Sequence, residues 1–214
     1  MAAPAEATIL DLNGSWLMDK TDSADPDEIF KLQGMSWFTR KAISVASVTL
    51  KVTQTTTDGV VHVDIDQVLT GGVKGTSEHR TLDWSEKPHQ DHIFGNVIGQ
   101  TRFVKAAAGA DGKSRPVIEV QTRVGGAEDE SVAKFLRGEI LENGDETEGF
   151  LVDEQNETFL QSWVVSQDSG WTGEQIWGFE TINGVRRHTR RIVVAKDDKA
   201  VKARMVYSYL GPRE

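Results

Sequence analysis

The feature that most constrains the fold of this chain is an alternation of apolar and polar side chains with a period of two residues. In the segment VVHVDIDQVL, Val61, Val63 and Ile65 alternate with polar residues, as expected for a strand with one buried and one solvated face. Similar runs, separated by turn signals such as TTDG, ADGK and ING, occupy residues 45–54, 92–104, 115–124, 158–166, 171–180, 185–195 and 200–210. Many short strands joined by short turns predict an all-β protein, either a sandwich or an up-and-down antiparallel barrel.

One helical stretch, DPDEIFKLQGMSWFTRKAI, interrupts this series after the first strand. It starts with an N-cap candidate at Asp25, a proline where helices accept one, and acidic residues in the first turn. Gly34 divides the stretch into two short segments. The sequence therefore predicts a short helix-turn-helix over residues 25–44.

The composition excludes several classes of protein. The chain has no cysteine, so it forms no disulfide, thiolate metal site or cysteine nucleophile. A net charge of −9 argues against nucleic acid as the main partner. The N-terminal segment lacks the pattern of a signal peptide, and no run approaches the ~20 apolar residues of a membrane span. We therefore expect a cytoplasmic protein that does not insert into membranes.

The first part of the chain resembles a known superfamily. Gly14-Ser15-Trp16 on the first strand, followed by two helices that end in Thr39-Arg40-Lys41, is similar to fatty-acid-binding proteins over about the first 55 residues. Lipocalins share the Gly-x-Trp, and both families belong to the calycins. This resemblance implies an antiparallel up-and-down calycin β-barrel of about 8–10 strands, with the helix pair as a lid over a lumen that holds a hydrophobic small molecule.

The last predicted strand departs from the fatty-acid-binding pattern. In that family the strand ends in an Arg-x-Tyr pair that holds a fatty-acid carboxylate; here Tyr207 takes the tyrosine position, but Met205 replaces the arginine. Strand alternation puts Arg204 on the opposite face. The resemblance to lipocalins instead implies that Arg204 packs against Trp16. The expected ligand is therefore less like a fatty acid than the helices suggest.

The length of 214 residues fits one domain. We expect a single calycin-like barrel domain over residues 1–214, with a flexible N-terminus at 1–10, the helical lid at 25–44 and an acidic insertion at 125–157. Residues 127–157 contain eleven Asp or Glu, whereas RRHTRR at 186–191 is basic. Both segments are typical of solvated surface, and the acidic one could alternatively be a contact surface in an interaction domain.

The aromatic faces of three predicted strands are expected to line the lumen, because a barrel of this size can hold one small ligand. These faces consist of odd-numbered positions, and core packing is the alternative role for each residue. The candidate ligand-binding residues on them are Trp163, Trp171, Gln175, Trp177, Phe179, Met205 and Tyr209. In the strand at 92–104, one polar face either lines the lumen or faces solvent; its members are His92, Asn96, Gln100 and Arg102.

The RRHTRR strand supplies the strongest indication of a polar contact inside the lumen. One face carries Arg186, His188 and Arg190, and one of its two faces must point inward. A buried arginine requires either an acidic neighbour or an anionic or carbonyl group of a ligand. If the chain is an enzyme, as a resemblance to other lipocalin-like barrels implies, the candidate catalytic residues are Tyr207, Arg190 and His188, any of which would polarise a carbonyl group.

Other site chemistry has little support in the sequence. His89 and His92, with His79 upstream, are not joined by further ligands at metal-site spacing. The sequence also contains no dinucleotide, phosphate-loop, serine-hydrolase or zincin motif. We expect neither a metal nor a cofactor.

Two functions remain open. Resemblance to lipocalin-like barrels of fungal natural-product pathways implies a cofactor-free cyclase or isomerase of the pericyclase type. Resemblance to fatty-acid-binding proteins implies an intracellular carrier of lipids or other hydrophobic small molecules that performs no reaction. We favour the enzyme, because a carrier gains little from the charge that RRHTRR places inside the barrel. The sequence does not indicate an oligomeric state.

Overall fold

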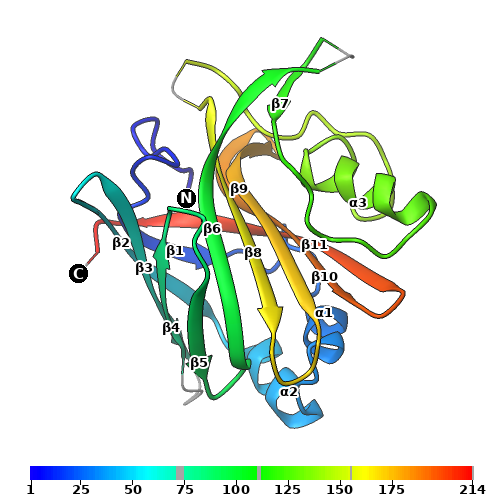
Figure 1. Cartoon of the computed structure of the whole chain (residues 1–214). Coiled ribbons are helices and arrows are strands. Elements are labelled where there is room, and N and C mark those ends of the chain that lie inside the picture. The colour runs from blue at the N-terminus through cyan, green and yellow to red at the C-terminus, as the bar shows by residue number, and fades with distance from the viewer. Residues whose placement is uncertain (71–74, 110–111, 155, 214) are drawn as a thin grey trace.

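The computed structural model describes residues 1–70, 75–109, 112–154 and 156–213. Within these residues it has eleven strands and three helices, arranged as an all-β, antiparallel, up-and-down fold (Figure 1). The helices are α1 (Asp27–Leu32), α2 (Trp37–Val45) and α3 (Ala127–Leu136). The strands are β1 (Gly14–Met18), β2 (Val48–Thr57), β3 (Val60–Leu69), β4 (Ser77–Thr81), β5 (Lys87–Asp91), β6 (Gly95–Ala108), β7 (Ser114–Pro116), β8 (Thr158–Ser166), β9 (Thr172–Ile182), β10 (Val185–Lys196) and β11 (Lys199–Gly211).

One curled sheet contains all of these strands. Its hydrogen-bonded order is β4-β3-β2-β1-β11-β10-β9-β8-β6-β5, with β7 attached to β6. β1 joins the first and last parts of the chain, because it pairs with both β2 and β11. β4 and β5 are the two ends of the order and, in the described residues, form no ladder with each other. The barrel therefore has an unpaired seam between β4 and β5.

The alternation found in the sequence accounts for the individual strands. In β2, Val48, Leu50 and Val52 are buried, whereas the residues between them are partly exposed. The β9–β10 hairpin turns at Asn183-Gly184, where both residues have positive φ angles of 50° and 76°. An Asn-Gly pair accepts that conformation readily, and a two-residue turn fixes the register of the strands beside it. Local sequence thus sets which residues of β9 and β10 lie opposite one another.

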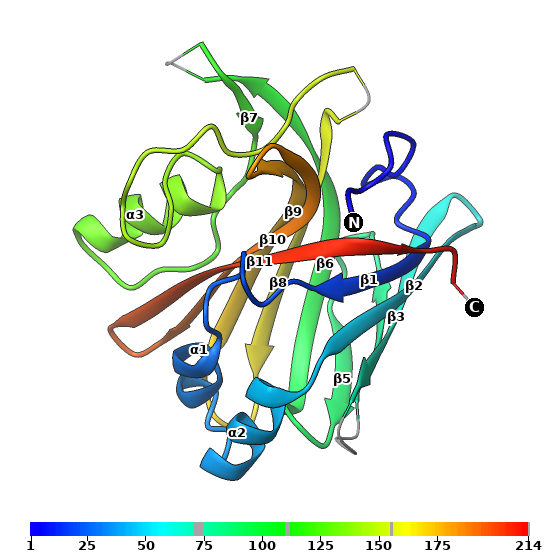
Figure 2. The same cartoon turned by 180° about the vertical axis from the view of Figure 1, so that it is seen from behind.

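The helix-turn-helix lies after β1, as predicted, and covers one end of the barrel (Figures 1 and 2). Gly34, with a φ of +85°, separates the helices. The Ser36 hydroxyl accepts a hydrogen bond from the backbone N–H of Thr39 at 3.2 Å and so caps α2. Arg40 ties the pair together, because its Nε donates to Asp27 of α1 at 3.0 Å and its Nη1 to the Met35 carbonyl at 3.0 Å.

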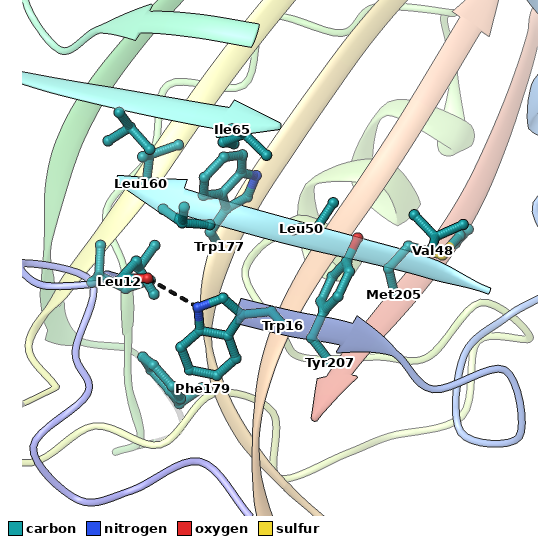
Figure 3. Packing of buried hydrophobic residues seen from close by; sticks show 14 of the residues in the cluster. Leu12, Trp16, Val48, Leu50, Ile65, Leu160, Trp177, Phe179, Met205 and Tyr207 are labelled. Carbon is teal, nitrogen blue, oxygen red and sulfur yellow. Dashed lines mark hydrogen bonds between the residues drawn. The ribbon is translucent and has the colours of Figure 1, made fainter. Parts of the chain in front are cut away.

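A cluster around Trp16 fills the barrel at the end away from the helices. Trp16 is fully buried, and its Nε1 donates to the Leu12 carbonyl at 2.9 Å (Figure 3). Its ring packs against Phe179 and Tyr209 at centroid distances of 6.2 and 4.9 Å. The partner expected for Trp16 was wrong, because Arg204 lies on the outer face of β11 and pairs with Glu180 at 3.1 Å. Aromatic rings and His188 surround Trp16 instead.

The first residues of the chain lie against the end of the barrel that the Trp16 cluster fills. The backbone N–H of Ala3 donates to the Arg186 carbonyl at 2.8 Å. The Arg186 guanidinium in turn donates to the carbonyls of Pro4 and Ala7 at 2.7 and 2.8 Å. Ala3, Ala7 and Ile9 are buried there.

The acidic segment covers the outer face of the sheet with a second hydrophobic cluster. In α3, Val132, Phe135 and Leu136 are fully buried and pack with residues of β8, β9 and β10. Beneath them Arg191, also fully buried, donates to Glu180 and to the carbonyls of Phe135 and Ile140. Arg191, on the outward face of RRHTRR, is therefore a buried partner of this layer.

The strand expected at residues 115–124 is largely wrong. Only Ser114–Pro116 pairs with β6, whereas the backbone N–H groups of Gln121 and Thr122 donate to the Glu174 carboxylate at 3.0 and 2.8 Å. A buried side chain thus takes the place of a neighbouring strand. The described chain has eleven strands, and the sequence did not indicate β4 and β5, because these two strands are too short and polar to show the alternation.

In the described part of the chain, none of the helices has the length and apolar character needed to cross a membrane.

Candidate ligand cavity

A cavity of about 680 Å³ lies inside the curled sheet, between the helix pair and the Trp16 cluster. We call this cavity the lumen. Its volume falls in the range of about 300–1,000 Å³ that is typical of small-molecule sites. Much of its wall is apolar and comes from α1, the loop before α2, and strands on both halves of the sheet; examples are Ile29, Met35, Leu50, Val97, Trp171 and Met205.

The lumen meets the surface near the helices and along the seam. Phe30, Gln33 and Ile43 belong to its wall at the helical end. His79 of β4 and His89 of β5 belong to its wall at the seam. Because these two strands do not pair, the lumen approaches solvent from the side as well as from the end.

Arg190 is the most unusual side chain of the lumen wall. It lies on β10, opposite Trp177 of β9 and Met205 of β11 in the strand registers, and it is only 5% exposed. Its guanidinium stacks on the Trp177 ring at 3.7 Å from the centroid and lies 5.2 Å from the Tyr207 ring. Burial lowers the pKa of Arg190, but a guanidinium stays protonated near neutral pH. Its Nη2 is buried and finds no hydrogen-bond partner among the described residues.

Tyr207 lies on the same wall, two positions beyond Met205 on β11 (Figure 3). Its ring is stacked on His188 at 5.5 Å with an angle of 29° between the planes. Burial raises the pKa of the Tyr207 hydroxyl, more than the positive charge of Arg190 lowers it. The hydroxyl therefore stays protonated near neutral pH and can donate a hydrogen bond.

His188 lies behind these two residues and does not belong to the lumen wall. Its Nδ1 is 3.0 Å from the Gly178 carbonyl and its Nε2 is 3.4 Å from Nε of Arg190. Burial, aided by the charge of Arg190, holds the pKa of His188 well below its usual value. A neutral ring with its proton on Nδ1 satisfies both contacts, since Nδ1 then donates and Nε2 accepts. Of the three candidate catalytic residues, His188 thus orients Arg190, whereas Arg190 and Tyr207 line the cavity.

A charged pair on β4 also lines the lumen, and the sequence interpretation missed it. Nε and Nη2 of Arg80 donate to one carboxylate oxygen of Glu78 at 3.0 and 2.6 Å, and Nη1 donates to Ser162 at 2.5 Å. Gln67 donates to the other oxygen of Glu78 at 2.7 Å. Burial opposes ionisation of Glu78, but Arg80 and Arg190 outweigh it and hold its pKa below the usual value. The only local signal is a Glu and an Arg two residues apart in SEHRT, which places them on one face.

The aromatic faces of β9 and β11 point into the barrel, but only some of the residues expected to line the lumen do so. Trp171, Gln175 and Met205 belong to the lumen wall. Trp177 and Phe179 point to the same side but are buried in the hydrophobic cluster below it. The Nε1 group of Trp177 donates to Gln175 at 2.8 Å. Tyr209 packs on Trp16 rather than on the cavity.

The orientation expected for Trp163 was wrong. On β8 the even-numbered residues face inward: Leu160 belongs to the inner cluster and Val164 to the lumen wall. The outer face of β8 is covered as well, since Gln161 is buried against Glu174 and the chain at Glu119. Both faces of β8 are therefore at least partly buried. The alternation of apolar and polar residues could not show which face points into the barrel.

The polar face of residues 92–104 lies outside the lumen. The inner face of β6 is formed by Val97, Gly99 and Thr101. Three of the polar residues have partners outside the lumen: Asn96 donates to Asp168, Gln100 to the Trp84 carbonyl and Arg102 to Gln161. The fourth, His92, is exposed in the turn before β6. These four candidates are thus not brought together with Arg190.

The seam histidines have acidic partners rather than a shared centre. His79 pairs with Asp64, and His89 lies 3.2 Å from Asp91. Over the described ranges, no three His, Asp or Glu side chains come together as the ligands of a metal ion would.

Comparison with known proteins now decides the family. No family model matches the sequence. The pericyclase pydY of an Acremonium species is 31% identical over 218 residues, which cover 100% of this chain and 99% of that protein. The chain belongs to the family of this pericyclase. The probable pericyclase scpY of Mollisia scopiformis is 27% identical over 214 residues, with coverage of 99% and 96%.

Solved structures similar to this pericyclase-family chain share its fold at low sequence identity. The Caenorhabditis elegans lipid binding protein 8 superimposes with a TM-score of 0.55 at 12% identity, covering 96% of this chain and 99% of that one. The Schistosoma mansoni fatty acid binding protein, solved with arachidonic acid, has a TM-score of 0.52 at 14% identity, with coverage of 93% and 96%. The fold of this pericyclase-family member is therefore the calycin barrel that its first strand and helix pair predicted.

Proposed function

We propose that this protein is a cofactor-free pericyclase that folds a hydrophobic, conjugated linear substrate inside the lumen and accelerates its cyclisation or isomerisation. The pericyclase relatives support the class of reaction. The observation that carries the proposal is Arg190, a buried cation with an unpartnered Nη2 in the wall of a largely apolar cavity. Such a group is costly to bury unless a polar atom of a ligand meets it.

The main contribution to rate would come from shape. A pericyclic step needs no nucleophile and no proton transfer, so a protein can accelerate it by holding the reacting carbons close together in a near-attack geometry. Orientation of this kind can lower a barrier by several kcal/mol, up to about 7–11 kcal/mol. The apolar wall that would hold the substrate in this geometry includes Trp171, Met205 and Leu50.

The second contribution would be electrostatic. Arg190 and the Tyr207 hydroxyl are hydrogen-bond donors on one wall, and both stay protonated near neutral pH. A carbonyl group conjugated with the reacting double bonds, if held by these donors, loses electron density to them and becomes a better partner for cyclisation. Donors that His188 and Trp177 already hold in place need little reorganisation as charge develops.

A carrier without turnover is the second candidate, favoured by the likeness of the barrel and its helix pair to lipid-binding structures. The two functions differ in whether the ligand leaves unchanged. A carrier also requires no donor beyond those that hold the ligand, so substitution of Tyr207 would alter affinity alone.

The test is to incubate the purified protein with linear conjugated polyenes that carry a carbonyl group, and to look by chromatography and mass spectrometry for products of unchanged mass. Arg190→Met should reduce the rate by roughly tenfold to a hundredfold, since it removes a charged donor. Arg137→Met is the matched control, because Arg137 lies beside α3, outside the lumen, and forms a partly exposed pair with Glu139. Tight binding of polyenes and fatty acids with no product from any of them would contradict the proposal and favour the carrier function instead.

A further inference from the structure

The charges of the inner lumen do not balance. Among the described lining residues, three charged side chains lie in its inner wall: Glu78, Arg80 and Arg190. Two guanidinium groups and one carboxylate leave a net charge of one positive unit. The other charged lining residues are two cations and two anions, which leave the net charge unchanged: Lys20, Asp25 and Lys87 are exposed, and Asp91 on β5 pairs with His89.

Among the described residues, no second carboxylate of the inner wall balances this positive charge, and Glu78 attracts both Arg80 and Arg190. Glu78 is engaged by Arg80 and Gln67, which take both of its oxygens. His188 is neutral, since burial depresses its pKa, and Tyr207 is neutral, since burial raises its pKa. The excess charge therefore resides at Arg190, whose Nη2 is buried and unpartnered among the described residues.

A buried and uncompensated charge discriminates between ligand groups. A neutral carbonyl could accept the hydrogen bond from Nη2, but the positive charge would remain isolated from water. An anionic oxygen would supply both the hydrogen bond and the missing charge. The aromatic rings of Trp177 and Tyr207 stabilise the guanidinium only in part, because a ring quadrupole carries no net charge.

We propose that the lumen selects a ligand with one negative charge on oxygen, a carboxylate or an enolate, attached to an apolar chain, and that this group binds Arg190 on the wall it shares with Tyr207. The inference deepens the proposed function, on which it rests for placing the substrate in the lumen. It names the substrate class as a singly charged anionic amphiphile. Glu78 then has a defined role: it compensates Arg80 and so leaves room for a single negative charge on the ligand.

The test compares two forms of one fluorescent probe. cis-Parinaric acid, a conjugated polyene with a carboxylate, and its methyl ester are each titrated into the purified full chain at neutral pH. The acid should bind about tenfold more tightly than the ester or better, as expected for a hydrogen bond between charged groups. Equal affinity of the two forms for the unmodified protein would overturn the inference.

Two substitutions should move the acid-to-ester affinity ratio in opposite directions. Arg190→Met removes the excess charge, so the ratio should fall to about one. Glu78→Gln keeps the size of the side chain and adds a positive unit to the lumen, so the ratio should rise. Arg137→Met, outside the lumen, should leave the ratio unchanged. A ratio that survives Arg190→Met, in a variant shown by circular dichroism to be folded, would refute the assignment.

Failure of the inference can be distinguished from failure of the proposed function. A preference for the acid that depends on Arg190, with no product from any polyene, supports the anion site and contradicts the enzyme. Product formation without any preference for the acid supports the enzyme and contradicts the anion site.

Discussion

Glu180 provides the sharpest test of how the sheet is held beneath the acidic layer. Its carboxylate accepts four hydrogen bonds in the described residues: from Thr189 at 3.0 Å, from Nε and Nη2 of Arg191 at 2.8 and 3.0 Å, and from Arg204 at 3.1 Å. Glu180 and Arg191 are almost wholly removed from solvent. Removing one partner of such a buried pair leaves an uncompensated charge and costs about 3–5 kcal/mol.

The perturbation is Glu180→Gln, which keeps the volume and deletes the charge. Against a total unfolding free energy of about 5–15 kcal/mol, this loss is large. With an m-value of about 2 kcal/mol per molar urea, the midpoint of unfolding should fall by about 1.5–2.5 M. Tryptophan fluorescence reports the transition, since the chain has six tryptophans. The control, Glu139→Gln, breaks a partly exposed pair with Arg137 and should cost no more than about 1 kcal/mol.

The same contact predicts a pH dependence. Burial opposes the ionisation of Glu180, but Arg191 outweighs it and holds the pKa of Glu180 below its usual value. A depressed pKa in the folded state gives stability that is complete above the unfolded value of about 4.3 and is lost as the pH falls through the folded value. The difference in urea midpoint between the unmodified protein and Glu180→Gln should therefore shrink below about pH 4. A midpoint equal to that of the unmodified protein near neutral pH would refute this account of the buried pair.

Three further predictions concern the site and its support. Burial keeps His188 neutral, so the plot of turnover rate against pH should show no inflection near the usual histidine pKa of about 6.5. Such an inflection would count against His188 as a neutral support of Arg190. Tyr207→Phe should lower kcat by roughly tenfold with a smaller change in KM, as for a donor that acts mainly in the transition state; single-turnover kinetics separate the two. Gly178→Ala should destabilise by about 1–3 kcal/mol, because an added Cβ would lie 2.5 Å from a ring carbon of Phe150; an unchanged thermal midpoint would contradict this.

Much of the fold could be predicted from the sequence because its signals are local. Strand alternation, the Gly34 break between the helices and the Asn183-Gly184 turn each depend on a few adjacent residues. These signals also placed the aromatic faces of β9 and β11 correctly, since on those strands the face opposite the aromatic residues is more polar. The resemblance of the first strand and helix pair added the calycin topology.

Orientation failed where both faces of a strand are covered. Trp163 was assigned inward, but β8 is buried on its outer side by Gln161, Glu174 and the chain at Glu119. Residues 115–124 alternate like a strand, yet Glu174 binds their backbone N–H groups. Alternation reports that two faces differ, and it does not report which neighbours cover them.

The sequence by itself determined that a positive charge had to enter the barrel, because either face of RRHTRR carries arginine. Only the tertiary structure decided that Arg190 enters the lumen while Arg191 lies beneath α3, and that Arg190 stands across from Met205. Only the tertiary structure also brought Glu78 and Arg80 to the same wall from β4. The physical reason is that charge compensation depends on groups that are close in space but distant along the chain, and no local pattern encodes that proximity.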